Sequence, residues 1–466
     1  MTLRLLDQDN SIILYGTVAI LMSMLGVAAI WFDTLWLMLI PLVLIVFLYL
    51  LSGTTISLYG ITAFLIPFST ELDLPGGIGL VFPGELMFLL LTVVGLITMI
   101  TRDRPKELYS YFTVFIILHL FWIAFTAIFA EYPLISFKYW LAKIWFIVPF
   151  YFLPFYSFRD IGDFDRVLRA LFWASVLAAL YVFVRHGLEG WTFASRTTIA
   201  KPFFRNHVNY ACLLLMVLPI SIYLYRRTKS YLYVLLVPVL LACIYVTYAR
   251  IAYVSILAMI VIYVLYHLRL IRTVVTMSAI GLIFACFYFI SGDRLLYFAP
   301  DYETTVSHSR FDRLLEASVE LKDISAMERA HRWMAGVEMI KDRPWLGFGP
   351  SNFYSCYQPY SINSFQTYVS DNPEQSGIHN YFLMVLVEQG FIGLAIFLII
   401  ILASYWKVTA LRADHISSPL VMLSLSWMTG IVIILMLNDM IEVVKLGPFF
   451  FMALWAVNYE NVQLKS

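Results

Sequence analysis

Charged residues are scarce in this chain: Asp, Glu, Lys and Arg make up 13% of its 466 residues, whereas 61% are hydrophobic. A soluble domain has about 25% charged residues, so most of this chain is expected to face lipid or a core buried in a membrane. The net charge of +1 gives no support for nucleic-acid binding. These shortages predict an integral membrane protein.

Common nucleotide and metal motifs are also absent. The chain has no Gly-rich phosphate loop of the Walker or dinucleotide type and no H-E-x-x-H motif, so neither ATP nor NAD is expected, and no cofactor is predicted. The few cysteines lie far apart, with neither metal-ligand spacing nor a disulfide framework. They are Cys212, Cys243, Cys286 and Cys356.

Long apolar runs predict transmembrane helices, each of which needs about 20 apolar residues. The first run, from Ser11 to Phe32, is too long for a signal-peptide core and predicts a retained helix. We therefore expect an all-α integral membrane protein with 12–14 transmembrane helices and a long, partly helical periplasmic loop. The runs cover roughly 11–31, 34–52, 55–69, 85–101, 108–130, 134–157, 165–185, 207–225, 231–249, 251–268, 273–291, 379–404, 417–437 and 445–459.

Lys and Arg residues concentrate in alternate loops, which predicts the orientation of the chain through the positive-inside rule. Arg102, Arg226 and Arg269 lie in one set of loops, whereas residues 70–84 of the other set contain neither Lys nor Arg. The first set and both termini are therefore predicted to be cytoplasmic. The predicted domains are membrane helices 1–11 in residues 1–291, a periplasmic loop in 292–378, and C-terminal membrane helices in 379–466.

The predicted periplasmic loop contains two amphipathic patterns. Ser309 to Leu321 has helical spacing of apolar residues. A second helix is expected to begin at a capping box, formed by Ser325 and Glu328, and to end near Lys341.

Three residues on the predicted outer side could carry chemistry. His379 lies at the start of a helix, where unsatisfied N–H groups attract phosphate. Arg250 opposes the positive-inside bias at a membrane boundary, although an ion pair with Asp439 or Glu442 would also explain it. Arg332, on the second outer helix, could simply lie on a solvated face. Together, two guanidinium groups and an imidazole suit a diphosphate and a general base.

Three segments resemble the O-antigen ligase/polymerase family. They are Tyr248-Ala249-Arg250-Ile251, the tract from Arg332 to Phe353 with its R-P-W-L-G-F-G-P-S-N-F sequence, and His379-Asn380 followed nine residues later by Gly390-Phe391-Ile392-Gly393. One position departs from the family, whose members commonly have Ser where this chain has Ala249.

The resemblance implies a metal-independent glycosyltransferase at the periplasmic face of the bacterial inner membrane. The implied donor is a glycan on undecaprenyl diphosphate, and the acceptor is lipid A-core for a ligase or a glycan for a polymerase. Arg250 and Arg332 would bind the diphosphate, and His379 would activate the acceptor hydroxyl. Further candidates for substrate binding are Arg205, Asn206, Asn380 and Lys143. Loop polarity would equally explain Arg205 and Asn206, and Lys143 could pair within the bundle.

Two alternatives remain open from the sequence. A lipid-linked glycan flippase or small-solute transporter would also be polytopic, although such proteins place charge near the membrane midplane. Asp7 with Asp9, and Asp163 with Asp165, resemble metal-binding D-x-D pairs. Because both pairs fall on the predicted cytoplasmic side, they are expected to be solvated, and no metal site is predicted.

Overall fold

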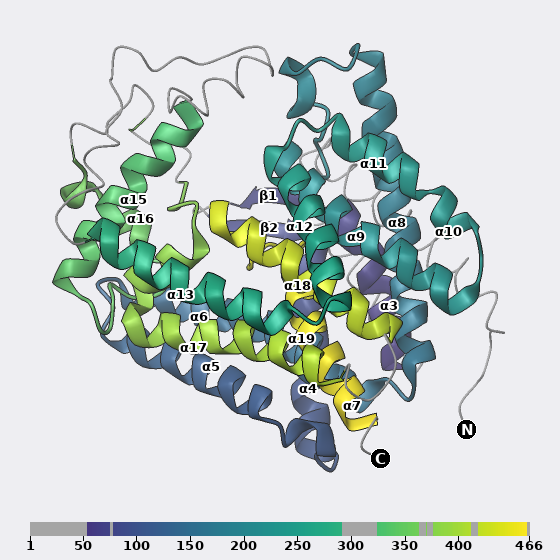
Figure 1. The fold of residues 1–466 in the computed structure, drawn as a ribbon, viewed down its shortest axis with the longest axis horizontal. Helices are drawn as coiled ribbons and strands as arrows, with labels where there is room; N and C mark the ends of the chain where they lie inside the picture. Colours follow the sequence, from purple (N-terminus) through teal and green to yellow (C-terminus); the bar gives the residue numbers. More distant parts are fainter. Residues whose placement is uncertain are drawn as a thin grey trace. The chain divides into compact units, whose positions relative to one another are not determined.

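The computed structural model of the protein describes residues 54–74, 78–290, 324–362, 370, 376–411 and 418–463. These residues are almost entirely helical (Figure 1). The predicted spans 11–31 and 34–52 and the predicted helix from Ser309 to Leu321 lie outside the described residues.

The described helices follow the apolar runs of the sequence closely. Seven of them are long and apolar enough to cross a membrane, and three shorter apolar helices accompany them in the described part of the chain. The prediction of an all-α integral membrane protein is confirmed. The long helices are α4 (Gly84–Thr101), α5 (Tyr111–Ile128), α8 (Ile161–Leu188), α9 (His207–Thr228), α12 (Arg250–His267), α17 (Tyr381–Leu411) and α18 (Pro419–Leu437), and the other helices of at least nine residues are α3 (Thr55–Leu65), α6 (Pro133–Ile147), α11 (Val237–Tyr245), α13 (Ile271–Ile290), α15 (Ile324–Asp342) and α19 (Gly447–Gln463).

Two predicted spans are interrupted where proline removes a backbone donor. The span 134–157 consists of α6, a π-helical turn η4 (Val148–Phe152) that contains Pro149, and α7 (Leu153–Ser157). The span 231–249 consists of α10 (Leu232–Leu235) and α11, which begins next to Pro238. The predicted loop 70–84 contains a hairpin of antiparallel strands β1 (Thr70–Leu74) and β2 (Ile78–Phe82).

The chain divides into two compact units. The first comprises Met1–Leu108, Trp145–Ala252 and Val443–Trp455, and the second comprises Tyr109–Ile144, Tyr253–Glu442 and Ala456–Ser466. In the first unit, α3 packs against α8, which also contacts α9. In the second unit, α17 contacts α5, α13, α15 and α18, so that it is the central helix of that unit.

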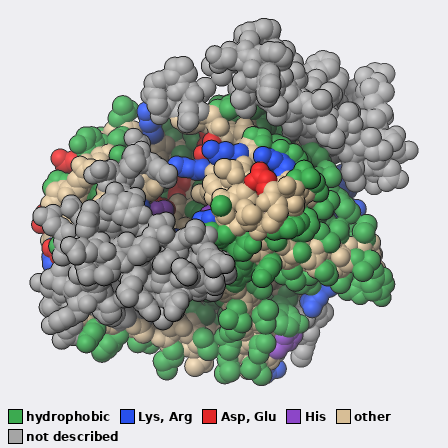
Figure 2. All heavy atoms as spheres, turned by 90° about the horizontal axis from the view of Figure 1, so that it is seen from above, with side chains coloured by type: hydrophobic (Ala, Val, Ile, Leu, Met, Phe, Trp, Pro, Cys, Tyr) green, Lys and Arg blue, Asp and Glu red, His purple; other side chains and the backbone are tan. Residues whose placement is uncertain are grey.

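Hydrophobic side chains cover much of the described surface, as expected for helices that face lipid (Figure 2). Only 33% of the most apolar stretch of α4, and the same share of α12, is buried within the protein. On the face drawn in Figure 2, Lys and Arg side chains gather together with a few acidic and His side chains. A charged surface bounded by apolar surface suits a protein that works at a membrane boundary.

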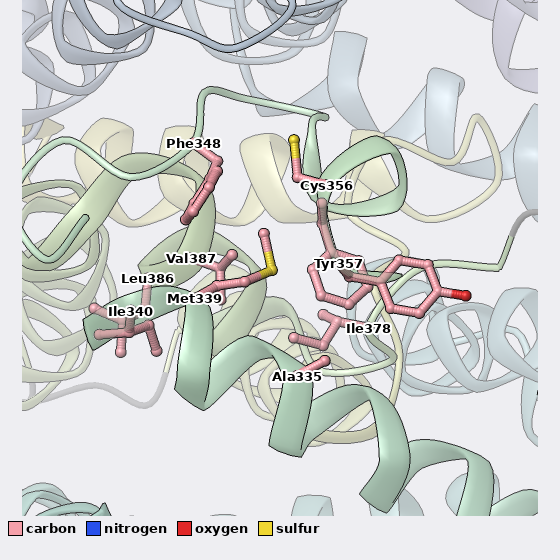
Figure 3. Packing of buried hydrophobic residues seen from close by; sticks show 10 residues of the cluster. Ala335, Met339, Ile340, Phe348, Cys356, Tyr357, Ile378, Leu386 and Val387 are labelled. Carbon is pink, nitrogen blue, oxygen red and sulfur yellow. The ribbon is translucent and has the colours of Figure 1, made fainter. Parts of the chain in front are cut away.

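Helix α15 packs against the N-terminal part of α17 through an apolar cluster (Figure 3). Ala335 and Met339 of α15 contact a cluster that includes Phe348, Ile378 and Val387. The helix predicted to end near Lys341 is therefore confirmed, but its predicted capping box is wrong. The helix begins at Ile324, so Ser325 lies within it, and the Glu328 carboxylate accepts a hydrogen bond from Ser370 at 2.8 Å.

Helix α17 breaks at Gly390, whose φ is 69° and ψ is −175°. The break leaves backbone groups that the tract before α16 (Phe353–Cys356) satisfies. The Phe348 N–H donates to Val387 O at 3.0 Å, the Gly349 N–H donates to Glu388 O at 2.9 Å, and the Phe391 N–H donates to Pro344 O at 2.9 Å. The Trp122 indole N–H donates to Gln389 O at 2.9 Å. The Gly-rich tract and the H-N-x9-G-x-x-G motif therefore form one interlocked structure.

We expect Gly390→Ala to destabilise the protein by about 2–5 kcal/mol, because it adds the cost of a left-handed backbone to that of overpacking. A Cβ at Gly390 would clash with the carbonyl of Trp345. Gly281 is the matched control, since a Cβ there meets nothing within 4 Å and its backbone is helical. Thermal unfolding of both variants in detergent measures the effect, and equal melting temperatures would contradict it.

Candidate functional site

His379 lies two residues before α17, in a conformation that few non-glycine residues adopt. Its φ is 56°, a left-handed value that His tolerates better than most residues. Asn380 is the N-cap of α17, since its side-chain oxygen accepts the Leu383 N–H at 3.0 Å. The sequence placed His379 in the first turn of the helix, whereas the helix begins two residues later, at Tyr381.

Asp439, which lies in the segment after α18, is next to the imidazole of His379. The distance from His379 Nδ1 to Asp439 Oδ1 is 3.7 Å, and the two side chains are 30% and 18% exposed. Gly377 permits this approach, because a Cβ there would clash with Asp439 Oδ2. The arrangement leaves the imidazole accessible while placing a carboxylate next to one of its nitrogens.

Two consecutive side chains of α15 hold the segment that carries His379. Arg332 Nη1 donates to Gly377 O at 3.3 Å, and Trp333 Nε1 donates to Ile378 O at 3.0 Å. Arg332 Nη2 also lies 3.3 Å from Glu328 Oε2. Arg332 is 5% exposed, so the interpretation of this residue as part of a solvated helix face is wrong. The cluster in Figure 3 fixes α15, and α15 in turn places a guanidinium group close to His379.

The surroundings of His379 favour its neutral form. Burial, and to a lesser extent the positive charges of Arg329 and Arg332, lower the pKa of His379 to about 3. Burial, together with the negative charge of Glu442, raises the pKa of Asp439. A neutral imidazole at neutral pH is the form that can accept a proton.

Lys143 pairs within the bundle. It is 2% exposed, forms an ion pair with Glu442, and donates to the Tyr381 hydroxyl at 2.7 Å. Glu442 Oε1 also accepts from the hydroxyls of Tyr139, at 2.6 Å, and Tyr381, at 2.8 Å. Of the two interpretations that the sequence left open for Lys143, substrate binding and pairing within the bundle, these contacts agree with the second.

Glu388 is a buried residue that the sequence analysis did not consider. Its carboxylate accepts the Ser351 N–H at 2.7 Å and the Phe353 N–H at 3.1 Å, and it is 2% exposed. A signal for it existed, because an acidic residue inside a long apolar run is costly unless it has partners. Nothing in the local sequence, however, indicated that those partners lie in the tract 35 residues earlier.

The remaining candidates lie in the first unit. Arg205 is 57% exposed and has its Nε 3.8 Å from Glu71 Oε2. Asn206 caps α9 by accepting the Asn209 N–H at 3.0 Å. Arg250 is the first residue of α12. Thr247 Oγ1 accepts the Ala249 N–H at 3.2 Å, so a neighbouring hydroxyl serves the backbone where the family commonly has Ser.

The expectation that Asp163 and Asp165 are solvated is wrong. They are 1% and 7% exposed, because both are paired. Asp163 lies 3.2 Å from Arg166, and Asp165 accepts from the Tyr223 hydroxyl at 2.6 Å and from Arg227 at 3.0 Å. Within the described ranges, no group of three or more His, Cys, Asp or Glu residues could hold a metal ion.

The segment with the three family-like motifs matches a protein-family model described as O-antigen ligase, over residues 234–398. These residues, the O-antigen ligase segment, are similar to that family. The O-antigen ligase segment includes Arg250, Arg332, His379 and Asn380, and it also contains the Gly390 break. No protein in the curated set that was compared matches the chain.

Proposed function

We propose that the protein transfers a glycan from undecaprenyl diphosphate to an acceptor hydroxyl at the periplasmic face of the bacterial inner membrane. We favour a ligase whose acceptor is lipid A-core. The observation that carries the proposal is the contact of Arg332 with the Gly377 carbonyl, two residues before His379, within the O-antigen ligase segment.

In the proposed reaction, His379 accepts the proton of the acceptor hydroxyl as its oxygen attacks the anomeric carbon of the glycan. The bond from that carbon to the diphosphate oxygen breaks, and the electron pair leaves with the diphosphate. Arg332 stabilises the charge that develops on this leaving group, as electrostatic catalysis requires, and only the family resemblance assigns Arg250 the same role. The two guanidinium groups take the part that a metal ion has in metal-dependent transferases, so no metal is required.

Purified protein tests this function when it is supplied with an undecaprenyl-diphosphate glycan and either lipid A-core or no second acceptor. Glycosylated lipid A-core is the product expected of a ligase, whereas longer lipid-linked glycans without lipid A-core would identify a polymerase. Activity is expected to survive EDTA. Loss of activity in EDTA that magnesium or manganese restores would contradict the metal-independent mechanism.

A flippase is the second candidate, because a broken helix such as α17 is frequent in transporters. Here the break is closed by backbone hydrogen bonds that Phe348 and Gly349 donate and that the Pro344 carbonyl accepts, which favours a fixed site over a moving gate. Translocation of a fluorescent lipid-linked glycan across proteoliposomes, without product formation, would support the flippase.

Cysteine labelling tests the topology that this function requires. We expect Lys341→Cys, on α15, to react with a membrane-impermeant reagent added to the periplasm. We expect Lys229→Cys, at the C-cap of α9, to react only after the inner membrane is opened. Both side chains are exposed. Reaction of both positions from the same side would overturn the orientation.

A further inference from the structure

Glu442 joins two helices of the second unit, α6 and α17, at a single oxygen atom. Its Oε1 accepts from Tyr139 and Lys143 of α6 and from Tyr381 of α17. Tyr381 and Lys143 are almost completely buried. Hydrogen bonds made by such buried donors have little competition from water.

Two residues of the cluster around Glu442 lie close in sequence to His379 and Asp439. Tyr381 follows His379 by two residues, and Glu442 follows Asp439 by three. The hydrogen bond from Tyr381 to Glu442, at 2.8 Å, therefore ties the segment of the imidazole to the segment of its neighbouring carboxylate. On the other side, Arg332 and Trp333 hold the carbonyls of Gly377 and Ile378. His379 is thus fixed from both sides by groups other than itself.

We propose that Glu442, acting through the Tyr381 hydroxyl, is a positioning residue that sets the imidazole of His379 against Asp439. The inference rests on the proposed function, because it assigns Glu442 a role in orienting the proposed base. Glu442 itself does not touch the substrate. A misplacement of about 1 Å can lower turnover by about 100-fold, so a small change in this hydrogen bond is measurable.

Tyr381→Phe is the test, because it removes one hydroxyl and keeps the ring that packs against Phe397. We expect kcat to fall about 10- to 100-fold, with the donor KM within about twofold of the original protein and a melting temperature close to it. Tyr405→Phe is the matched control. Tyr405 is also buried on α17, and its hydroxyl lies 3.1 Å from Thr429 Oγ1, away from His379 in the sequence. We expect the control to retain kcat.

An unchanged kcat in Tyr381→Phe, or an equal loss in Tyr405→Phe, would overturn the inference. If Tyr381→Phe does not fold, the double variant Lys143→Met with Glu442→Gln serves instead, since it removes both charges and leaves an amide oxygen for Tyr381. A lower kcat at unchanged donor KM would then support positioning, and original kcat would refute it. His379→Asn separates this inference from the function itself, because full activity of that variant would refute the proposed base.

Discussion

His379→Asn is expected to lower turnover by about 10²- to 10⁴-fold, which is the usual contribution of a general base. Asn is chosen because its side chain tolerates the left-handed backbone at this position, where φ is 56°. Donor binding should change little, since in the proposed mechanism the guanidinium groups bind the diphosphate. Turnover of the lipid-linked glycan, donor binding and thermal stability should be measured on the same preparation.

His267→Asn is a suitable control for this prediction, because His267 is an exposed residue in the last turn of α12. It should retain the turnover of the original protein. Turnover within about twofold of the original protein in a folded His379→Asn variant would remove His379 from the mechanism. Reduced binding of the donor, with unchanged turnover at saturation, would instead make His379 a binding residue.

The pH dependence of kcat/KM should reflect the lowered pKa of His379. Since burial, Arg329 and Arg332 all favour the neutral imidazole, the base form persists below the ordinary histidine pKa of about 6.5. We therefore expect kcat/KM to be retained as the pH falls from about 7 to 6, where an unperturbed histidine would already lose activity. An acid limb centred near pH 6.5 would contradict the described environment of the imidazole.

The sequence predicted the helix bounds that depend on a local run of apolar residues. The bounds of α4, α5, α9 and α18 fall close to the ends of their apolar runs, because a membrane helix satisfies its backbone within one segment. Where proline interrupts that pattern, as in η4, the prediction of one continuous span failed.

The site required contacts between distant segments, which no local pattern contains. The sequence identified Arg332 and His379, but it offered a solvated helix face as the simpler interpretation of Arg332, which is buried. It named Asp439 only as a partner for Arg250, whereas its carboxylate lies beside His379. The backbone hydrogen bond from Phe348 to Val387 joins the two motifs, and it becomes visible only in the folded chain.

Arg332→Lys should impair the enzyme nearly as severely as Arg332→Ala. The guanidinium group of Arg332 uses Nη1 for Gly377 O and Nη2 for Glu328, and its positive charge lowers the pKa of His379. A lysine ammonium keeps the charge but cannot reproduce this planar fork. A charge-assisted hydrogen bond contributes about 1.5–3 kcal/mol, so we expect donor affinity to fall about 10- to 100-fold in either variant.

The two Arg332 variants should nevertheless differ in one respect. Arg332→Ala removes a positive charge that lowers the pKa of His379, so the acid limb of its kcat/KM profile should move to higher pH, whereas Arg332→Lys should leave the limb near its original position.

Arg343→Lys is the control, because Arg343 is 41% exposed and its ion pair with Glu131 at 2.7 Å is a surface contact that contributes little to stability. If Arg332→Lys binds the donor as well as the Arg343→Lys control does, a point charge is sufficient and the bidentate role of Arg332 is wrong. If instead both Arg332 variants melt early while their folded fraction remains fully active, Arg332 serves only to hold α15 against the segment of His379.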